Sequence, residues 1–316
     1  MPVRNAEKTL DRTLETILYQ SYTNIVEIIL AVGPSDDETS VLAKELKKID
    51  SRIQIVENRT GGTARGLNLA SKLATGEYLV RVDSHCLLPN NYVDIAVKKI
   101  KETGAGNVGG IQMATGESGF QSAVATAMTS KFGVGNSKFH YGGSEGPVDT
   151  VYLGVFDAAL FTELGGFDEK LVRNQDYELN IRIREAGRSV WFTPEMVVKY
   201  LPRSNISQLF WQFFQYGSWK RKVIFKHPKS VKIRQLAPPS LVALIVASVI
   251  LFVVFSAWYL IPLATYLLVS IAVSILQRKL PLQLRVTLSL IFITMHVAWG
   301  LGFLVGRATT HTIPDK

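Results

Sequence analysis

Two short segments, far apart in the chain, hold the residues best suited to chemistry. Residues 80–85 (VRVDSH) form a mainly apolar run that ends on Asp83 and then His85. Residues 174–178 (NQDYE) carry two carboxylates, Asp176 and Glu178, where a helix is expected to begin. A carboxylate at a strand end can hold a divalent cation or face a diphosphate, and a second carboxylate can act as a general base. The sequence therefore predicts a cation site and a proton acceptor.

Alternating strand-like and helix-like segments are expected to position these residues. The fold class that this alternation favours is α/β, with a Rossmann-like, mostly parallel sheet and crossover helices over residues 1–203. Ligands of open sheets of this kind bind at the carboxyl ends of strands, where Asp83 lies. The strands are predicted at residues 25–32, 53–56, 78–82 and 107–113, and the helices at 7–20, 38–49, 63–74 and 91–102, the last ending near Gly104.

The N-terminal end departs from this pattern. Residues 7–20 predict an amphipathic helix, and no strand is visible before it. A doubly wound sheet normally begins with a strand, often an interior one, and its loss leaves unpaired edges on both neighbours. We expect the first strand to be truncated and the protein to start several residues upstream of Met1. The intact mass of the protein made from its native locus tests this expectation.

The apolar residues concentrate at the C-terminal end. Of the 316 residues 47% are hydrophobic, and residues 241–276 and 286–306 contain no Asp, Glu, Lys or Arg. A helix crosses the bilayer core in about 20 residues, so the first run is long enough for two spans, with a turn near Pro262. Three spanning helices are predicted, at residues 241–258, 260–276 and 286–306, in preference to buried helices of a soluble domain.

The positive charges predict how these spans are oriented. Seven Lys and Arg residues between 220 and 234 precede the first span, and three lie between the second and third. Cytoplasmic flanks carry such an excess, so residues 1–235 are expected in the cytoplasm and the tail, residues 307–316, outside. The single cysteine, Cys86, and a polar N-terminus without a signal peptide agree with this location. The expected location is the inner or cell membrane, as a multi-pass protein.

The net charge of +9 owes much to the basic residues before the first span. Anionic lipid head groups explain this placement better than nucleic acid does, so membrane lipids are expected partners and nucleic acid is not.

Several motifs, taken together, resemble a known family. The chain looks like a family 2 inverting glycosyltransferase of the GT-A fold, in the membrane-anchored bacterial exopolysaccharide group that includes the succinoglycan-type enzymes. The resemblance covers nearly the whole chain. It rests on residues 2–5 (PVRN), 61–68 (GGTARGLN), 82–85 (VDSH), 165–169 (GGFDE), 175–179 (QDYEL) and 296–300 (HVAWG).

The resemblance implies a metal site at Asp83 and His85. Asp83 matches the first acid of the family's Asp-x-Asp motif, which holds a divalent cation against the donor diphosphate, and His85 replaces the second acid. Imidazole suits Mn²⁺ better than Mg²⁺, so Mn²⁺ is the expected cofactor if His85 is a ligand. His85 bonding a phosphate oxygen, a structural His85, and Asp83 as a plain turn residue are the alternatives.

Asp176 matches the family's general base, which takes the proton of the acceptor hydroxyl in an inverting transfer. The alternative is an acid placed at a helix N-terminus for capping and the helix dipole. Glu178 points about 200° away on a helix, so it is expected to be structural, paired with Arg182.

The glycine-rich residues 61–68 are predicted to approach the nucleotide, although they lack the Lys-Ser/Thr ending of a P-loop. By resemblance Pro2, Arg4, Arg65 and Asn68 line the nucleotide pocket, and a solvated Arg65 on a flexible turn is the alternative. The acids by which the family contacts the nucleotide base are missing near Val32 and Gly33. The resemblance favours uridine, but no residue at these positions identifies the base.

On the acceptor side the resemblance implies a closing loop at Gly165, Gly166, Phe167 and Asp168. Residues 204–235 mix aromatic and basic residues in the manner of an interfacial helix that presents a lipid-linked acceptor. Gln215, Trp219 and Arg221 loosely resemble the Gln-x-x-Arg-Trp motif of processive synthases, but their order and spacing differ. A direct catalytic role for them is the alternative to the interfacial helix. His296 and Trp299, in the last span, are expected to be packing residues.

The resulting hypothesis is a metal-dependent transferase that moves a hexose from a nucleotide-sugar, with a UDP-sugar favoured, to a polyprenyl-diphosphate-linked glycan. Transfer to polyprenyl phosphate and an idle nucleotide- or glycan-binding subunit of a polysaccharide-assembly complex are the alternatives. Asp176→Asn separates an enzyme from such a subunit, because only an enzyme loses its activity. Transport is disfavoured, since the spans carry no Asp, Glu, Lys or Arg.

Overall fold

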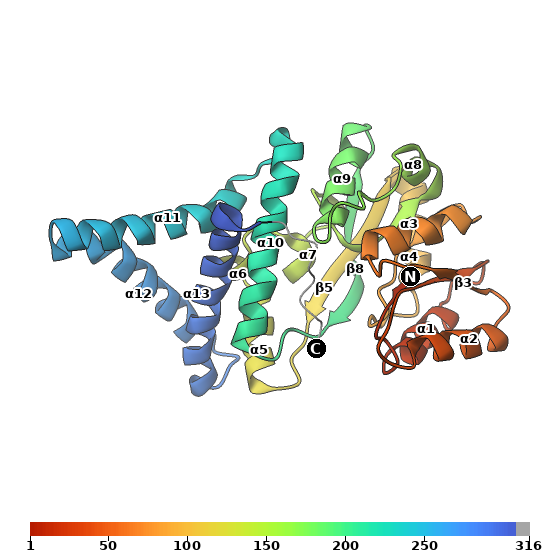
Figure 1. Ribbon diagram of the computed structural model, residues 1–316, viewed down its shortest axis with the longest axis horizontal. Coiled ribbons are helices and arrows are strands. Elements are labelled where there is room, and N and C mark those ends of the chain that lie inside the picture. The colour runs from red at the N-terminus through yellow and green to blue at the C-terminus, as the bar shows by residue number, and fades with distance from the viewer. Residues whose placement is uncertain (308–316) are drawn as a thin grey trace. The chain divides into compact units, whose positions relative to one another are not determined.

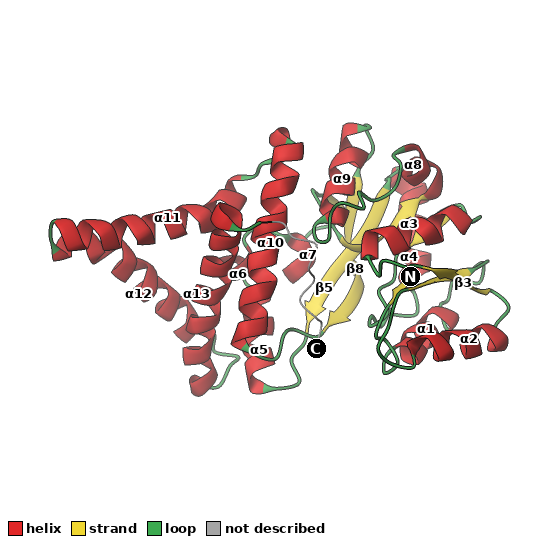
Figure 2. Ribbon diagram, in the orientation of Figure 1, coloured by secondary structure: helices red, strands yellow, loops and turns green. Residues whose placement is uncertain are grey.

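The computed structural model describes residues 1–307. They form two compact units: the first comprises residues 1–113 and 141–200, and the second comprises residues 114–140 and those from 201 onward (Figure 1). The first unit holds all the strands, and the second is helical (Figure 2).

A small parallel sheet forms the N-terminal part of the first unit. Its strands are β1 (Pro2–Val3), β2 (Ile28–Val32) and β3 (Ile53–Glu57), in the order β1-β2-β3. The strand β1 corrects the expectation that none precedes the first helix: two residues are too few to show an alternating pattern. The helices are α1 (Leu10–Leu18), α2 (Thr39–Ile49) and α3 (Thr63–Leu73). Leu10, Leu14 and Ile17 lie on one face of α1 and are buried, as its amphipathic pattern predicts.

A second sheet has the order β4-β7-β5-β8-β6. Both β4 and β5 run antiparallel to β7, so these two strands share one direction. Helix α4 ends at Gly104, whose φ of +65° suits glycine, and this predicted end is confirmed. The elements are β4 (Tyr78–Val80), α4 (Tyr92–Thr103), β5 (Asn107–Ala114), β6 (Gly146–Pro147), β7 (Tyr152–Asp157), α8 (Ala158–Glu163), α9 (Gln175–Glu185) and β8 (Val190–Tyr200).

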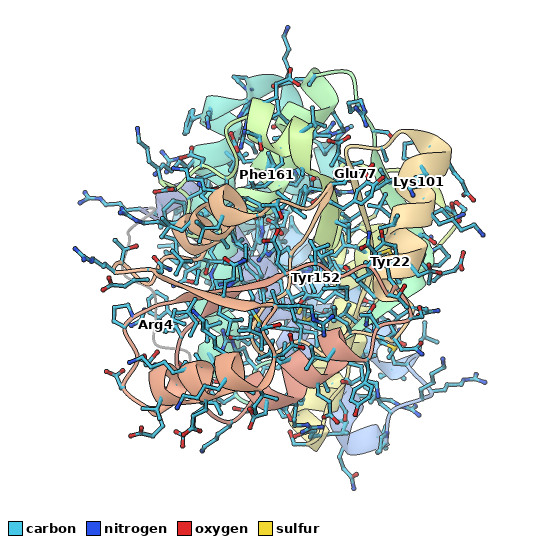
Figure 3. All side chains as sticks on the ribbon, turned by 90° about the vertical axis from the view of Figure 1, so that its right-hand side faces the viewer. Arg4, Tyr22, Glu77, Lys101, Tyr152 and Phe161 are labelled. Carbon is cyan, nitrogen blue, oxygen red and sulfur yellow. The ribbon has the colours of Figure 1, made fainter. Side chains whose placement is uncertain are left out.

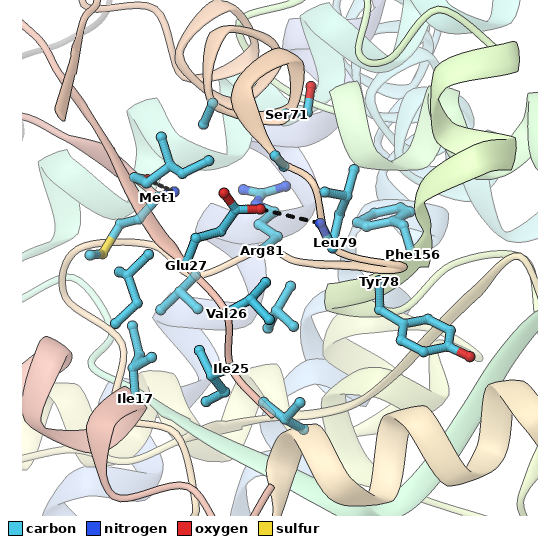
Figure 4. A pocket seen from close by; sticks show the side chains of 18 of the residues that line it. Met1, Ile17, Ile25, Val26, Glu27, Ser71, Tyr78, Leu79, Arg81 and Phe156 are labelled. Atoms are coloured by element: carbon cyan, nitrogen blue, oxygen red, sulfur yellow. Dashed lines mark hydrogen bonds between the residues drawn. The ribbon is translucent and has the colours of Figure 1, made fainter. Parts of the chain in front are cut away.

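An apolar core fills much of the first unit, and a cavity of about 230 Å³ lies beside β2 and β4. Figure 4 shows the side chains around it: Met1 donates its amino N–H to the Ile29 carbonyl (2.8 Å), and Glu27 accepts from the Gly76 N–H (3.2 Å). Arg81 lies behind Glu27 in this view. The fully buried members of the core include Leu10, Leu14, Leu30, Ile53, Tyr92, Val155 and Met196.

The second unit consists of helices, and glycines bring two of them close together. A side chain at Gly217 would overlap the Trp299 carbonyl, and one at Gly302 would overlap the Phe214 carbonyl. The elements are α5 (Gly119–Met128), α6 (Lys131–Val134), α7 (Lys138–Tyr141, ending at the boundary with the first unit), α10 (Ile206–Lys226), η1 (Pro228–Ser230), α11 (Ile233–Val254), η2 (Ala257–Leu260), α12 (Ile261–Ile275) and α13 (Leu282–Val305).

Three segments of this unit are long and apolar enough to cross a membrane: Ile233–Val254, Ala257–Ile275 and Leu282–Val305. The turn predicted near Pro262 lies between α11 and α12. Pro262 itself lies in the first helical turn of α12. His296 has both ring nitrogens bonded, Nδ1 to the Tyr266 hydroxyl (2.9 Å) and Nε2 to the Phe132 carbonyl (2.8 Å), and its packing role stays a prediction. The predicted tail lies, from residue 308 on, outside the described residues.

Candidate functional site

The loops after β1, β2 and β3 meet at one edge of the parallel sheet. Arg4 is exposed there (Figure 3). Its side chain lies against Gly61, whose φ is +66°. Arg65 is also exposed, in the first turn of α3. Pro2 lies under α3, where a side chain at Gly66 would come within 3.4 Å of it. The structure thus gathers Pro2, Arg4 and Arg65 at the strand ends, and their role in binding a nucleotide remains a prediction.

Asp83 lies at the end of β4 and is bound by Arg81. The backbone N–H of Arg81 donates to the Gly154 carbonyl of β7 (3.1 Å), so the chain is still extended after the end of β4. Side chains alternate along extended chain: Val82 enters the core, while Arg81 and Asp83 share the other face. Arg81 Nε donates to Asp83 Oδ1 (3.2 Å) and Nη2 to Oδ2 (3.3 Å). Burial alone would raise the pKa of Asp83, but the charges of Arg81 and His85 outweigh it and hold the pKa below its ordinary value.

The second predicted carboxylate reaches the same arginine. Asp176 lies in the first turn of α9, after Asn174, which has a φ of +59°. Its Oδ2 is 3.8 Å from Arg81 Nη1, and about a third of its side chain is exposed. The structure therefore brings Asp83 and Asp176 together around one buried guanidinium. No sequence motif points to Arg81. Its place two residues before Asp83 in the same strand-like run is the signal that could have identified it.

The side chains around Asp83 fit a divalent cation. Ligand atoms of Asp83, His85 and Cys86 lie within 4.8 Å of one another, which is close to the separation of about 4.5 Å that two atoms sharing one cation can reach. Burial raises the pKa of the Cys86 thiol to about 12, and its Sγ contacts the Tyr152 hydroxyl at 3.5 Å. The Cys86 side chain is 1% exposed, so it is less accessible to a cation than the side chains of Asp83 and His85. Asp83 and the exposed His85 therefore form the candidate ligand pair.

The loop at residues 164–169 is tied to α3. The Asn68 amide donates to the Phe167 carbonyl (2.8 Å) and to Glu169 Oε1 (3.1 Å), and its Oδ1 accepts from the Phe167 N–H (2.9 Å). Gly165 and Gly166 have φ values of +76° and +72°. The ring of Phe167 lies 5.9 Å from the Arg81 guanidinium. Asn68, predicted to face the nucleotide, thus fixes this loop beside the site, and its nucleotide contact remains a prediction.

An ion pair on α9 holds the same loop from the other side. Arg182 donates to the carbonyls of Leu164 and Gly166, both at 2.7 Å. It also pairs with the fully buried Glu178 at 2.7 Å, so the predicted pair is confirmed. Asp168 Oδ1 accepts from the Lys170 N–H (2.9 Å) within the turn. The Glu178–Arg182 pair and Asn68 together hold the backbone at Gly165 and Gly166 in place.

The remaining predicted acceptor-side residues lie on α10, in the second unit. The Trp219 ring is buried, with the Lys222 ammonium 4.7 Å from its centre. Arg221 Nη1 donates to the Leu304 carbonyl at 2.9 Å. Their contact with an acceptor remains a prediction.

Comparisons with known proteins give a consistent result. Residues 1–163 match the family description "Glycosyl transferase family 2". The succinoglycan biosynthesis protein ExoA of Rhizobium meliloti is 30% identical over 240 residues, which are 75% of this chain and 73% of that protein. A transferase of Methanococcus voltae, named for a dolichyl N-acetyl-α-D-glucosaminyl phosphate acceptor and a diacetamido-dideoxy-glucuronosyl group, is 28% identical over 72% of this chain and 73% of its own.

Among solved structures, a mannosyltransferase from Pyrobaculum calidifontis in complex with GDP-Man and Mn²⁺ is similar, with a TM-score of 0.66 and 17% identity. The match covers 95% of this chain and 85% of that one. At this identity the likeness shows the fold alone, and the fold is the predicted GT-A fold followed by apolar C-terminal helices.

Proposed function

The chain belongs to glycosyl transferase family 2 and is a glycosyltransferase, and on that premise we propose that it transfers a hexose with inversion. The proposed donor is a nucleotide-sugar, with a UDP-sugar favoured, and the proposed acceptor is a polyprenyl-diphosphate-linked glycan. The observation that carries the proposal is the meeting of Asp83 and Asp176 around Arg81. In the proposal Asp83 serves the donor side of the reaction and Asp176 serves the acceptor side.

In the proposed reaction Asp176 is the general base. Its carboxylate accepts the proton of the acceptor hydroxyl while that oxygen bonds to the anomeric carbon. The bond from this carbon to the diphosphate breaks on the opposite face, and the electron pair leaves with the nucleoside diphosphate. The proton remains on Asp176 until it passes to solvent. The partly exposed carboxylate leaves room for both the hydroxyl and this exchange.

Asp83 and His85 are the proposed ligands of a divalent cation, which would offset the charge that develops on the departing diphosphate. The nitrogen-plus-oxygen donor set supports Mn²⁺ over Mg²⁺. The similar mannosyltransferase, whose structure is a complex with GDP-Man and Mn²⁺, supports a divalent metal in this fold.

The nucleotide is proposed to lie along the ends of β1, β2 and β3. Arg4 and Arg65 are exposed cations at that edge and suit the charge of a nucleoside diphosphate. Pro2 and the glycines after β3 shape the same edge.

The acceptor side and the location are proposed from the apolar segments and from the relatives. Three segments able to span a membrane, preceded by basic residues, support an inner or cell membrane protein with a cytoplasmic catalytic unit. The names of the two relatives, succinoglycan biosynthesis and a dolichyl-linked acceptor, support a lipid-linked glycan in polysaccharide synthesis. The loop at residues 165–168 and Trp219 with Arg221 are the proposed acceptor contacts.

The experiment is release of nucleoside diphosphate from a panel of nucleotide-sugars, with membranes that carry the full chain and extracted lipid-linked glycans. Mn²⁺, Mg²⁺ and EDTA are compared, and Asp176→Asn is tested beside Asp94→Asn, which changes an exposed carboxylate on α4. We expect release from one donor, dependent on metal and on Asp176 and unaffected at Asp94. No release from any donor, or equal release by both variants, would overturn the proposal.

A further inference from the structure

We propose that Arg81 is a positioning residue that couples the two halves of the site: it holds Asp83 until the cation and donor engage that carboxylate, and then hydrogen-bonds Asp176. This inference rests on the proposed function, because it assigns Asp83 to the donor side and Asp176 to the base.

Among the described residues, the guanidinium has one terminal NH₂ group, Nη1, free for a second partner. Nε and Nη2 form a fork on Asp83, at 3.2 and 3.3 Å. Nη1 is buried and has no hydrogen-bond partner among the described residues. It lies 3.8 Å from Asp176 Oδ2, which is close enough for an ion pair and too far for a hydrogen bond. A buried N–H without a partner is costly, so a small movement toward Asp176 is favoured once the fork opens.

The cation and Arg81 compete for the same atoms. Both oxygens of Asp83 accept from Arg81, and His85 stands where a second acid would have supplied another carboxylate. A cation therefore meets one carboxylate that is already paired with a positive charge. A bound cation would weaken the fork by repulsion and by taking lone pairs, and the Asp176 carboxylate lies only 3.8 Å from the guanidinium.

The surroundings restrict this movement to the guanidinium. The Arg81 backbone is bonded to Gly154 in the sheet. The ring of Phe167 lies 5.9 Å from the guanidinium carbon, and Asn68 fixes Phe167 in turn. Asp83 and Asp176 can therefore exchange as partners of Arg81 without a change in the path of the chain.

A second arginine provides a matched control. Arg52 forms the same kind of fork on a carboxylate two residues away, with Nε 3.1 Å from Asp50 Oδ1 and Nη2 2.7 Å from Oδ2. Its side chain is 36% exposed, against 9% for Arg81. No second carboxylate pairs with Arg52 among the described ion pairs. Replacing Arg52 thus removes an arginine–carboxylate fork and leaves Arg81 and its two carboxylates unchanged.

The experiment uses the full chain in detergent and compares wild type, Arg81→Gln, Arg81→Lys and Arg52→Gln. Mn²⁺ binding is measured without nucleotide, from the electron paramagnetic resonance signal of free Mn²⁺, and kcat and the donor KM are measured separately. For Arg81→Gln we expect Mn²⁺ to bind about tenfold tighter, because a neighbouring positive charge is gone. We expect kcat to fall about 10- to 100-fold, the scale of a hydrogen bond to a charged group.

Arg81→Lys keeps the charge without the fork, so it should bind Mn²⁺ with nearly the affinity of wild type and still lose most of kcat. Arg52→Gln should leave the Mn²⁺ affinity and kcat within about twofold of the wild-type values, because surface ion pairs contribute little. Unchanged or weaker Mn²⁺ binding by Arg81→Gln, or a kcat equal to that of Arg52→Gln, would overturn the inference.

If Arg81→Gln does not fold, the kcat of Arg81→Lys decides: a loss with Mn²⁺ affinity retained supports the coupling, and no loss overturns it. If neither variant folds, Arg81 is structural and the inference fails. A wild type that transfers no sugar refutes the proposed function instead, and the Mn²⁺ measurement still reports on the fork.

Discussion

The tie between Asn68 and Phe167 gives a prediction that separates two roles for one residue. Asn68→Ala removes the acceptor of the Phe167 N–H and the donor to the Phe167 carbonyl. Asn68 and Phe167 are 8% and 4% exposed, so water does not readily replace the lost partners. Each unsatisfied backbone group costs about 1–2 kcal/mol, which gives a loss of about 3 kcal/mol in the free energy of unfolding.

For a unit of this size, about 3 kcal/mol lowers Tm by about 10 °C. The assay is thermal unfolding of the purified protein, followed by intrinsic tryptophan fluorescence, beside Asn90→Ala, which changes an exposed asparagine. Asn68→Asp keeps the acceptor for the Phe167 N–H but places a carboxylate against the Phe167 carbonyl and Glu169, so it should be destabilised as well. An unchanged Tm with a raised donor KM would refute this reasoning and would assign Asn68 to the nucleotide.

Three further predictions follow from the packing. Glu178→Gln leaves Arg182 without its buried partner and should lower the free energy of unfolding by about 3–5 kcal/mol, measured by denaturant titration, whereas equal stability would contradict the role given to this pair. Gly302→Leu should prevent α13 from packing on α10, because its side chain would overlap the Phe214 carbonyl; size-exclusion chromatography should then show loss of the monodisperse peak, and Val286→Leu, which changes a 73% exposed side chain on the same helix, should retain it. Cys86, buried and with a thiol pKa of about 12, should resist maleimide at pH 7.5 in the folded protein and react after unfolding; rapid labelling of the folded protein would count against the burial.

Local patterns predict those elements whose signals are local. The sequence predicts a helix at residues 38–49 and a strand at 53–56, and the structure has α2 at Thr39–Ile49 and β3 at Ile53–Glu57. Apolar periodicity carries this information within a few residues of chain, and Gly104 marks the end of α4 in the same local way. The same holds for the apolar C-terminal segments, whose length and lack of charge alone identify them.

Contacts between distant parts of the sequence are not predictable in this way. Asn68 and Phe167 are 99 residues apart, and nothing local distinguishes an asparagine that ties a loop from one that faces a nucleotide. The packing of residues 114–140 with the C-terminal helices has no local pattern either. Arg81 is visible beside Asp83 in the sequence, but its second carboxylate, Asp176, becomes its neighbour only through the fold.

The most direct test of the central claim, that Asp176 serves as the base of an inverting transfer beside Asp83, is the configuration of the new glycosidic bond. The donor found in the release assay is used to make product, and the anomeric proton coupling is measured by nuclear magnetic resonance. The account predicts a configuration opposite to that of the donor, and no product with Asp176→Asn. A product that keeps the donor's configuration, or one formed equally well without the Asp176 carboxylate, would contradict it.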